Sequence, residues 1–450
     1  MPQDKEKTKS RLPGQNPETV SNHAQEPEAL AAAAAVPAPK GQKSCTFVEN
    51  ISLERYDAFV HSQPDCNLLQ SAPWPRVKSE WKALRVGLEV ADGQLVAGAQ
   101  ILCRPLAFGY SFGYLAHGPL LDYREPGLLE SFLKELRGLA RRQHCLLLRV
   151  HPPCRIHEGH IEDFRSGQEK TVIPEKELIA RFATAGFTLQ PRSRRMADTI
   201  QPRFEAVILK DSRQEPPRAK IKYNLKLCER HKVSLRCGGR EDLDEFSRLI
   251  RMTEARQGVR LRDKAYFERL FDAFGENASL YFADIDLAAA QAHAAQREKD
   301  LLDELADAQA GRSGKKEKQV QEKLLSVRKD LSFYAELMKE PSDTHTAAAI
   351  LVLRYGKTAE MPYAGSDEHY ARLPAVWALY VQGIRDAFAV GCERYNLGGL
   401  EGSLDDGLTS FKAHFDPLIE ETCGEFDYSG HPLLCGLFKR ALALYKKLRR

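Results

Sequence analysis

Cys392-Glu-Arg-Tyr-Asn-Leu-Gly-Gly-Leu-Glu-Gly402 is the stretch around which we interpret this chain. An apolar helical run covers residues 376–390 before it, and Gly391 follows where a helix C-cap favours glycine. A short strand then reaches Gly398 and Gly399, a pair that lets backbone approach a ligand closely. The layout is therefore helix, glycine stop, strand and glycine turn, which suits group transfer.

One lysine follows this turn. Lys412 stands between Phe411 and Phe415, after an acidic loop that contains Asp405 and Asp406. Burial between aromatic rings lowers the pKa of an ammonium group, whereas neighbouring carboxylates raise it. The carboxylates favour a cationic Lys412, which would suit group transfer. The alternative is an ordinary strand-to-loop connection whose lysine reaches solvent.

Composition restricts the class of protein. The chain has 450 residues, of which 43% are hydrophobic, so two or three domains with real cores are expected. Lys and Arg total 66 against 62 Asp and Glu, and any electrostatic signal must therefore come from local clusters. No apolar run is long enough to span a membrane and no signal pattern opens the chain, so we expect a soluble, cytoplasmic protein. The ten cysteines form no C-x-x-C pair, and no metal site is expected.

Hydrophobic periodicity gives an order of elements that occurs twice, as helices, hairpin strands, helix and strand. An Asp-Gly turn at Asp92 and Gly93 marks the clearest hairpin. We expect strands at residues 82–90, 94–104, 108–115, 145–150, 199–209, 278–285, 346–354 and 358–363, and helices at residues 127–143, 175–185, 242–256, 263–274 and 376–390.

Two further segments differ from this pattern. Residues 203–240 carry 11 Lys and Arg against 4 Asp and Glu, with cations at 222, 226 and 230 on one helical face. This face is either a plain solvated surface or a site for phosphates, of nucleic acid or of a diphosphate ligand. Residues 288–339 are rich in Ala, Glu, Lys and Leu and are broken once by glycine, which predicts two antiparallel helices projecting as an arm.

The motifs and their order resemble the Fem family, the aminoacyltransferases that build the interpeptide bridges of peptidoglycan. The resemblance covers residues 47–426. The motifs that carry it are Leu69-Gln70-Ser71 with Trp74 and Val77-Lys78, Tyr114-Leu-Ala-His-Gly-Pro-Leu-Leu-Asp122, Lys222-Tyr-Asn-Leu-Lys226, Thr253-Glu-Ala-Arg256 with Tyr266-Phe267, and Tyr395-Asn-Leu-Gly-Gly399 with Phe411-Lys412.

The resemblance implies a fold of the α/β (α+β) class: two tandem acetyltransferase-like (GNAT) domains with an inserted antiparallel coiled-coil arm. The expected division is a disordered tail at 1–42, a first domain at 43–202, a second at 203–430, the arm at 288–339 within it, and a basic C-terminal helix at 431–450. That last helix could rest on anionic headgroups at the inner membrane face, or its cations could simply complement the helix dipole.

The resemblance also implies roles for individual residues. Lys412 would lie beside the transferred acyl group, and Gly398 and Gly399 would form the close-approach turn. The implied substrate-binding residues are Lys78 and Lys222 on a diphosphate, Tyr114 and Asp122 along the peptide channel, and Tyr266 on the substrate. The family usually has arginine at the position of Lys222, Arg-Gly-Pro where this chain has His117-Gly118-Pro119, and aspartate where Asn396 stands.

The implied reaction moves an amino acid from aminoacyl-tRNA to an amine of the stem peptide of a lipid-linked precursor. Aminoacyl-tRNA is then a co-substrate, no other cofactor is expected, and no DNA partner is expected. The ester is already activated, so the site must supply a neutral amine, oxyanion stabilisation and a proton for the leaving oxygen. The alternatives are an acyl-CoA-type N-acyltransferase, whose pyrophosphate loop motif is missing, and a non-catalytic RNA-binding scaffold. The amino acid, the bridge position, the acceptor amine and the oligomeric state stay open.

Overall fold

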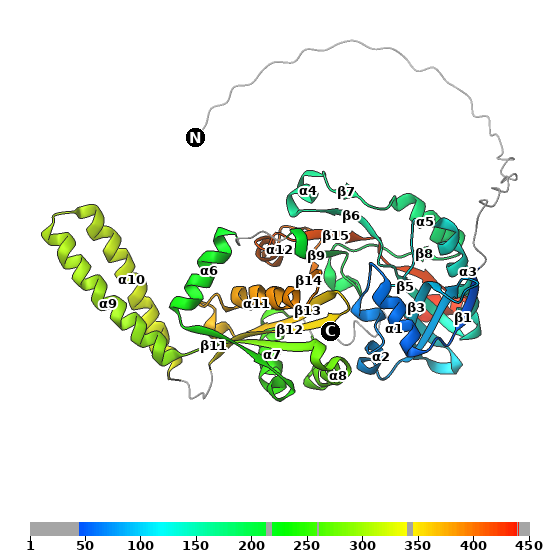
Figure 1. Ribbon diagram of the computed structural model, residues 1–450, viewed down its shortest axis with the longest axis horizontal. Helices are drawn as coiled ribbons and strands as arrows, with labels where there is room; N and C mark the ends of the chain where they lie inside the picture. The colour runs from blue at the N-terminus through cyan, green and yellow to red at the C-terminus, as the bar shows by residue number, and fades with distance from the viewer. Residues whose placement is uncertain (1–44, 213–217, 259–260, 340–344, 439, 441–450) are drawn as a thin grey trace, which may run out of the picture. The chain divides into compact units, whose positions relative to one another are not determined.

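Two mixed β-sheets organise the computed structural model, which describes residues 45–438 and 440 without 213–217, 259–260 and 340–344 (Figure 1). The tail expected at 1–42 lies outside the described residues. So does most of the basic C-terminal helix, although residues 432–438 are helical.

The first sheet has seven strands and is built mainly from the first half of the chain. Antiparallel pairing runs through its first four strands, and the fourth and fifth are parallel. Helices α3 (Pro126–Arg142) and α5 (Glu175–Thr184) bury their apolar residues against one face. The strand order is β1 (Thr46–Glu49), β2 (Lys82–Glu89), β3 (Leu95–Pro105), β4 (Ser111–Ala116), β5 (Cys145–His151), β16 (Phe426–Tyr428) and β8 (Thr188–Leu189).

The second sheet has nine strands. The core on one of its faces includes residues of α6 (Ala219–Arg230) and α11 (Ala375–Ala389). The strand order is β10 (Val233–Gly238), β11 (Ala278–Ile285), β12 (Thr346–Tyr355), β13 (Thr358–Ser366), β14 (Arg394–Leu400), β9 (Phe204–Leu209), β15 (Leu418–Thr422), β6 (Arg155–Gly159) and β7 (Lys170–Thr171).

The chain crosses between the sheets in both directions. Strands β6 and β7 follow β5 in sequence but join the second sheet, and β16 follows β15 but joins the first. Arg149 of β5 ties the returning segment in place, with Nε 2.8 Å from Asp427 and an Nη 2.9 Å from Glu425. The domain boundary expected between residues 202 and 203 is therefore crossed twice. The first sheet contains β16, which comes after this boundary, and the second sheet contains β6 and β7, which come before it.

One hydrophobic core is shared by the two halves. Helices α1 (Leu53–Ser62) and α2 (Trp74–Val77) contribute buried residues to the same cluster as α7 (Leu243–Gln257) and α8 (Lys264–Phe274). Burial of this common apolar surface favours packing of the two halves against each other.

The expected arm is confirmed. Helices α9 (Leu287–Ala310) and α10 (Gly314–Leu337) lie antiparallel and extend away from the sheets (Figure 1). Leu301, Val320 and Val327 are buried where the helices face each other. The expected fold class, mixed α/β with two sheets and an inserted helical pair, is therefore confirmed.

Two strands begin later than the sequence predicts. The strand expected from residue 108 starts at Ser111, because Ala107–Gly109 form a turn in which Phe108 has φ +59°. The strand expected from residue 199 starts at Phe204, two residues after Pro202, which has no N–H to donate to a ladder. The short strands β6, β7, β8, β15 and β16 are not predicted, since they are too short to show a period.

Candidate active site

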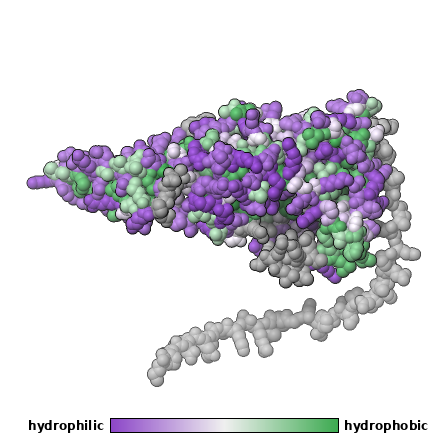
Figure 2. Space-filling model, turned by 90° about the horizontal axis from the view of Figure 1, so that it is seen from below, coloured by the Kyte–Doolittle hydropathy of each residue, from purple (hydrophilic) through white to green (hydrophobic). Residues whose placement is uncertain are grey.

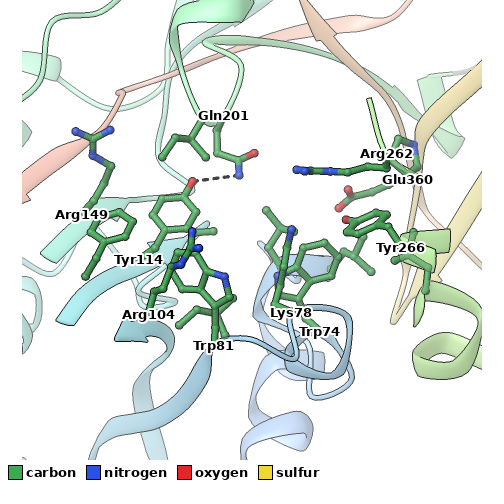
Figure 3. Close-up of a pocket in the computed structure, with 18 of the residues that line it drawn as sticks. Trp74, Lys78, Trp81, Arg104, Tyr114, Arg149, Gln201, Arg262, Tyr266 and Glu360 are labelled. Atoms are coloured by element: carbon green, nitrogen blue, oxygen red, sulfur yellow. Dashed lines mark hydrogen bonds between the residues drawn. The ribbon is translucent and has the colours of Figure 1, made fainter. Parts of the chain in front are cut away.

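A cavity of about 1070 Å³ lies between the two halves of the body. Tyr114, Arg149 and Gln201 contribute to one side of it, and Arg262, Tyr266 and Glu360 to the other, as Figure 3 shows. Its lining mixes aromatic and aliphatic side chains with a few charged groups, which is typical of a site for an organic ligand.

Three cations surround Tyr266. Lys78 and Arg262 line this cavity with it, and Arg269 lines a neighbouring cavity that Arg262 and Tyr266 also reach. The Nζ of Lys78 lies 5.0 Å from the centre of the Tyr266 ring and 5.5 Å from that of Trp74. The guanidinium carbons of Arg262 and Arg269 lie 5.1 Å and 5.8 Å from the same Tyr266 ring. Cation–π attraction holds each group near the ring, but the three like charges still repel one another. The arrangement is suited to an anion with more than one negative charge.

The electrostatics of Lys78 reflect this crowding. Burial, together with the neighbouring charges of Arg262 and Arg269, lowers the pKa of Lys78 to about 8. An anion bound between the three cations would offset both effects and favour the charged ammonium. The cluster therefore gains most from a ligand such as a diphosphate.

The position of this cluster follows from how two short helices meet. Asp263 caps α8 by accepting a hydrogen bond from the backbone N–H of Tyr266 at 2.9 Å, which fixes the first turn. Arg269 donates to the carbonyl of Val77 at 3.3 Å, and Arg76 donates to the carbonyl of Ala273 at 3.1 Å. These bonds join α2 to α8, so the cation site needs both halves of the chain.

Tyr114 forms another part of the cavity wall. Its hydroxyl accepts a hydrogen bond from Nε2 of Gln201 at 3.1 Å, and burial raises its pKa. The side chain is thus a neutral phenol near neutral pH, held with its hydroxyl toward Gln201 (Figure 3). Such a group can orient a peptide by hydrogen bonding without adding charge.

Glu360 of β13 is the acidic group that lines the cavity. Asn67 donates a hydrogen bond to its Oε1 at 3.1 Å. Burial first, and the neighbouring charge of Glu205 second, raise the pKa of Glu360 to about 7. A carboxylate with this pKa can accept a proton near neutral pH and release it again. Figure 3 draws Glu360 on the same side of the cavity as Arg262 and Tyr266.

Lys412 lies deeper and is not part of the cavity wall. It belongs to α12 (Gly407–Ala413), is 4% exposed, and donates to the carbonyl of Gly399 at 2.9 Å. Gly398 has φ +86°, and a Cβ built there would lie 3.7 Å from the lysine Nζ. The glycine turn and the lysine, which the sequence predicts to act together, are therefore adjacent. Beside the lysine, Phe411 of α12 and Phe415 just after it pack their rings against Trp377 and Tyr380 of α11.

The charge of Lys412 is set by opposing effects. Burial lowers its pKa to about 8, while Glu205 and Asp406 act to raise it. The lysine is therefore mostly cationic at neutral pH. Glu205 affects both Lys412 and Glu360, so it links the lysine electrostatically to the carboxylate that lines the cavity.

Two of the predicted site residues lie elsewhere. Asp122 is exposed, and its carboxylate accepts the backbone N–H of Arg124 at 2.9 Å within a turn. Lys222 is exposed on α6 and does not line the cavity. The structure thus brings together Lys78, Tyr114 and Tyr266 in one site and Gly398, Gly399 and Lys412 beside it.

Three groups of the site are missing from the sequence prediction. Arg269 stands three residues after Tyr266 on α8, so helical spacing places it near that ring. Arg262 precedes the N-cap of that helix, and no helical pattern identifies it. Glu360 stands in the middle of a strand with no local signal for function, and only its position across from Asn67 identifies it.

Two features are absent from the described residues. No group of three or more His, Cys, Asp or Glu side chains there is placed to hold a metal ion. No helix among those residues is long and apolar enough to cross a membrane.

Comparison with known proteins assigns the family. The sequence model of the FemAB family matches residues 51–443. The lipid II:glycine glycyltransferase of Staphylococcus haemolyticus (strain JCSC1435) is 25% identical over 406 residues, covering 84% of this chain and 92% of that protein. That of Staphylococcus aureus (strain MRSA252) is 24% identical over 408 residues, with the same coverage.

Among solved structures, the crystal structure of FemX superimposes with a TM-score of 0.66 at 22% identity, covering 87% of this chain and 99% of that one. The fold is therefore shared along nearly its whole length. Because the family match extends over most of the sequence, the chain belongs to the FemAB family and is a tRNA-dependent aminoacyltransferase that builds the interpeptide bridge of peptidoglycan.

Proposed function

We propose that the protein transfers an amino acid from aminoacyl-tRNA to an amine on the stem peptide of a lipid-linked peptidoglycan precursor. The observation that carries this proposal is the cavity between the halves, where Lys78 and Arg262 line the wall beside Tyr266, and Arg269 approaches the same ring from a neighbouring cavity. A lipid-linked precursor has a diphosphate next to its sugar, and the cation cluster matches that charge.

The acceptor is held by the cavity in this proposal. The diphosphate lies against Lys78, Arg262 and Arg269, and the stem peptide extends past Tyr266 and Tyr114. Lys222 has no part in this binding, because it is exposed on α6 away from the cavity lining. The relatives named above are lipid II:glycine glycyltransferases, which makes glycine the first amino acid to test with this chain.

Glu360 is the proton acceptor in the proposed reaction. The acceptor amine attacks the ester carbon of the aminoacyl-tRNA and loses one proton, which passes to the Glu360 carboxylate. A C–N bond forms as the C–O bond to the ribose breaks. The pKa of Glu360, about 7, suits this transfer because the group is largely ionised just above neutral pH.

Lys412 serves the leaving side of the same reaction. Its ammonium group stabilises the negative charge that develops on the ester and ribose oxygens. The ribose oxygen leaves as a hydroxyl after receiving the proton that Glu360 took from the amine, which returns Glu360 to its carboxylate form. Burial in an aromatic cluster strengthens this effect, since few water molecules screen the charge. The charge of Glu205 acts on both groups and raises the pKa of Glu360 and of Lys412.

The basic face of α6 is proposed to contact the tRNA. Arg218 forms an ion pair with Asp416 just beyond α12, and the charges of Lys220 and Arg218 contribute to a lowered pKa of His414. The N-terminal end of α6 thus lies beside the helix that carries Lys412. Exposed cations there suit phosphates of a nucleic acid that delivers its 3′ end to Lys412.

The test is direct. Purified protein is incubated with lipid-linked precursor and each of a panel of charged tRNAs, and the product is weighed by mass spectrometry. A mass increase of one amino acid residue with one or a few tRNAs supports the proposal. A product in which the nucleophile is an alcohol, or acyl transfer from coenzyme A without tRNA, would contradict it.

A further inference from the structure

The turn between β3 and β4 exposes an aromatic side chain. Phe108 is 97% exposed and has φ +59°. The turn around it is closed by the backbone N–H of Leu106, which donates to the carbonyl of Tyr110 at 2.8 Å. The turn therefore holds a large apolar side chain in contact with water. Exposed apolar residues that are adjacent to one another mark interaction sites.

A second apolar element lies next to this turn. Residues 432–438 are helical, with Leu433 88% exposed and Leu437 also exposed. These two leucines are four residues apart and therefore lie on one face. The opposite side is anchored, because Cys435 is buried in a cluster with Leu146 and Leu147.

Contacts join the turn and the helical segment into one surface. The rings of Tyr110 and His431 lie 5.6 Å apart, and Leu106 and Phe438 pack against the same small cluster. We call the exposed residues of these two elements, Phe108, Leu433, Leu434 and Leu437, the apolar rim. On the face of the molecule drawn in Figure 2, hydrophobic residues gather into a patch.

The rim is continuous with the cavity. Arg104, Pro105 and Leu106, which precede the exposed turn, line the cavity, and so does Phe438 at the end of the helical segment. A ligand with a long apolar tail could thus leave its polar part among the cavity cations and extend its tail along this edge.

The charges around the rim have one sign. Residues 104–112 and 429–450 contain no Asp or Glu. The described Lys and Arg residues there are Arg104 and Arg440. The sequence adds Lys439, Lys446, Lys447, Arg449 and Arg450, which lie outside the described residues. Segments that combine exposed apolar residues with cations, and that contain no acidic residue, suit binding to a membrane with an apolar interior and anionic headgroups.

We infer that the apolar rim docks on an anionic lipid bilayer, so that the cavity receives its acceptor directly from the membrane. The delivery of the acceptor from the membrane rests on the proposed function, whereas binding of the rim to lipid does not require catalysis. Phe108, Leu433 and Leu437 enter the boundary between headgroups and acyl chains, and the surrounding cations contact the headgroups.

Vesicle sedimentation tests the inference without tRNA or precursor. The full chain is mixed with vesicles of phosphatidylcholine alone, or with one third phosphatidylglycerol. We expect binding to the anionic vesicles, weakened by salt, and a loss of at least tenfold in the triple variant Phe108→Ser, Leu433→Ser, Leu437→Ser. Val390→Ser, which changes an exposed apolar residue at the end of α11, is the matched control and should bind within twofold of the wild type.

A second readout separates the rim from the catalytic site. With a soluble nucleotide-linked acceptor, the triple variant should have wild-type kcat and KM, whereas its KM for an acceptor embedded in vesicles should rise at least tenfold. Equal vesicle binding by the wild type and the triple variant would overturn the inference, even if transfer activity is confirmed.

Other occupants of the rim give different results. If residues 439–450 cover it, their deletion will increase vesicle binding, whereas docking on anionic lipid predicts a decrease. If a second copy covers it, the wild type will sediment as a dimer that the triple variant dissociates. Either result would contradict docking on lipid.

Discussion

The ammonium group of Lys78 lies 5.0 Å from the centre of the Tyr266 ring, although one residue follows α2 and the other belongs to α8. The two helices come from opposite halves of the chain and meet through a shared core. The anion site therefore exists only when the halves are assembled, and its electrostatics depend on both.

Ligand binding should depend on pH through Lys78. Its pKa of about 8 lies below the usual lysine value, so the free protein loses this charge as pH rises through 8. A bound diphosphate favours the protonated form, and affinity should fall as pH increases from 7 to 9.5. Titration calorimetry with a soluble nucleotide-linked precursor measures this.

The matched control for that experiment is Lys78→Arg. An arginine stays cationic throughout this range, so its binding curve should be nearly flat between pH 7 and 9.5. A wild-type affinity that is constant over the same range, or an arginine variant with the same slope as wild type, would contradict the role of Lys78.

Lys412→Met should abolish catalysis while leaving the fold intact. Methionine is apolar and similar in length, so it fills the buried space and removes the cost of burying a charge. Loss of a positive charge at developing oxyanions typically lowers kcat by about 10²–10³. The measurement is transfer of a radiolabelled amino acid, with precursor binding and thermal unfolding as controls. Full activity in this variant would exclude Lys412 from the reaction.

Glu360→Gln should lower kcat by about 10²–10⁴, the usual contribution of a general base. The amide keeps an oxygen that can accept the hydrogen bond of Asn67, so the local geometry is preserved. In the wild type, activity should rise as pH increases through about 7, because Glu360 must be ionised. This rise of activity near pH 7 should disappear in the glutamine variant. If the rise persists, a group other than Glu360 accepts the proton.

Glu205→Gln tests the link between the two titrating groups. The charge of Glu205 raises the pKa of both Glu360 and Lys412. Without that charge, both limbs of the pH–kcat profile should move to lower pH: the rising limb of Glu360 and the falling limb that follows loss of the Lys412 cation. A movement of only one limb would show that Glu205 is coupled to a single group.

Much of the fold is predictable because its signals are local. The hairpin of β2 and β3 follows from Asp92 and Gly93 between alternating residues, and β5 follows from a continuous apolar run. The short strand β16 has no such signal. Its three residues are held by pairing with β5 and β8 and by the ion pairs of Arg149, which are tertiary interactions.

The candidate site also contains residues whose placement is predictable from the sequence and residues whose placement is not. The burial of Lys412 is predictable from its neighbours Phe411 and Phe415, since flanking apolar residues tend to enter a core. Helical spacing predicts that Lys222 lies on a charged face but does not determine what that face contacts. Glu360 and Arg262 become functional candidates only when folding places them on one cavity, because no local pattern relates them.

The arm should be removable in its distal part without loss of the body. Glu298 and Arg328 face each other across the two helices, with 2.6 Å between Oε1 and Nε. Replacing residues 299–327 with a short Gly-Ser turn therefore rejoins positions that are already close. We expect a folded protein whose melting temperature is within a few degrees of wild type, measured by circular dichroism.

Deletion of the whole segment 288–339 should be more harmful, because the base of the arm belongs to the core. Asp330 accepts a hydrogen bond from Arg372 at 2.9 Å, and Tyr334 and Leu337 are buried in the cluster of the second sheet. Loss of these two apolar side chains alone costs on the order of 4 kcal/mol. Transfer activity of the shorter deletion then reports on the distal arm itself, because its body keeps these contacts. If both deletions unfold the protein equally, the distal helices stabilise the body in a way that their packing against each other does not indicate.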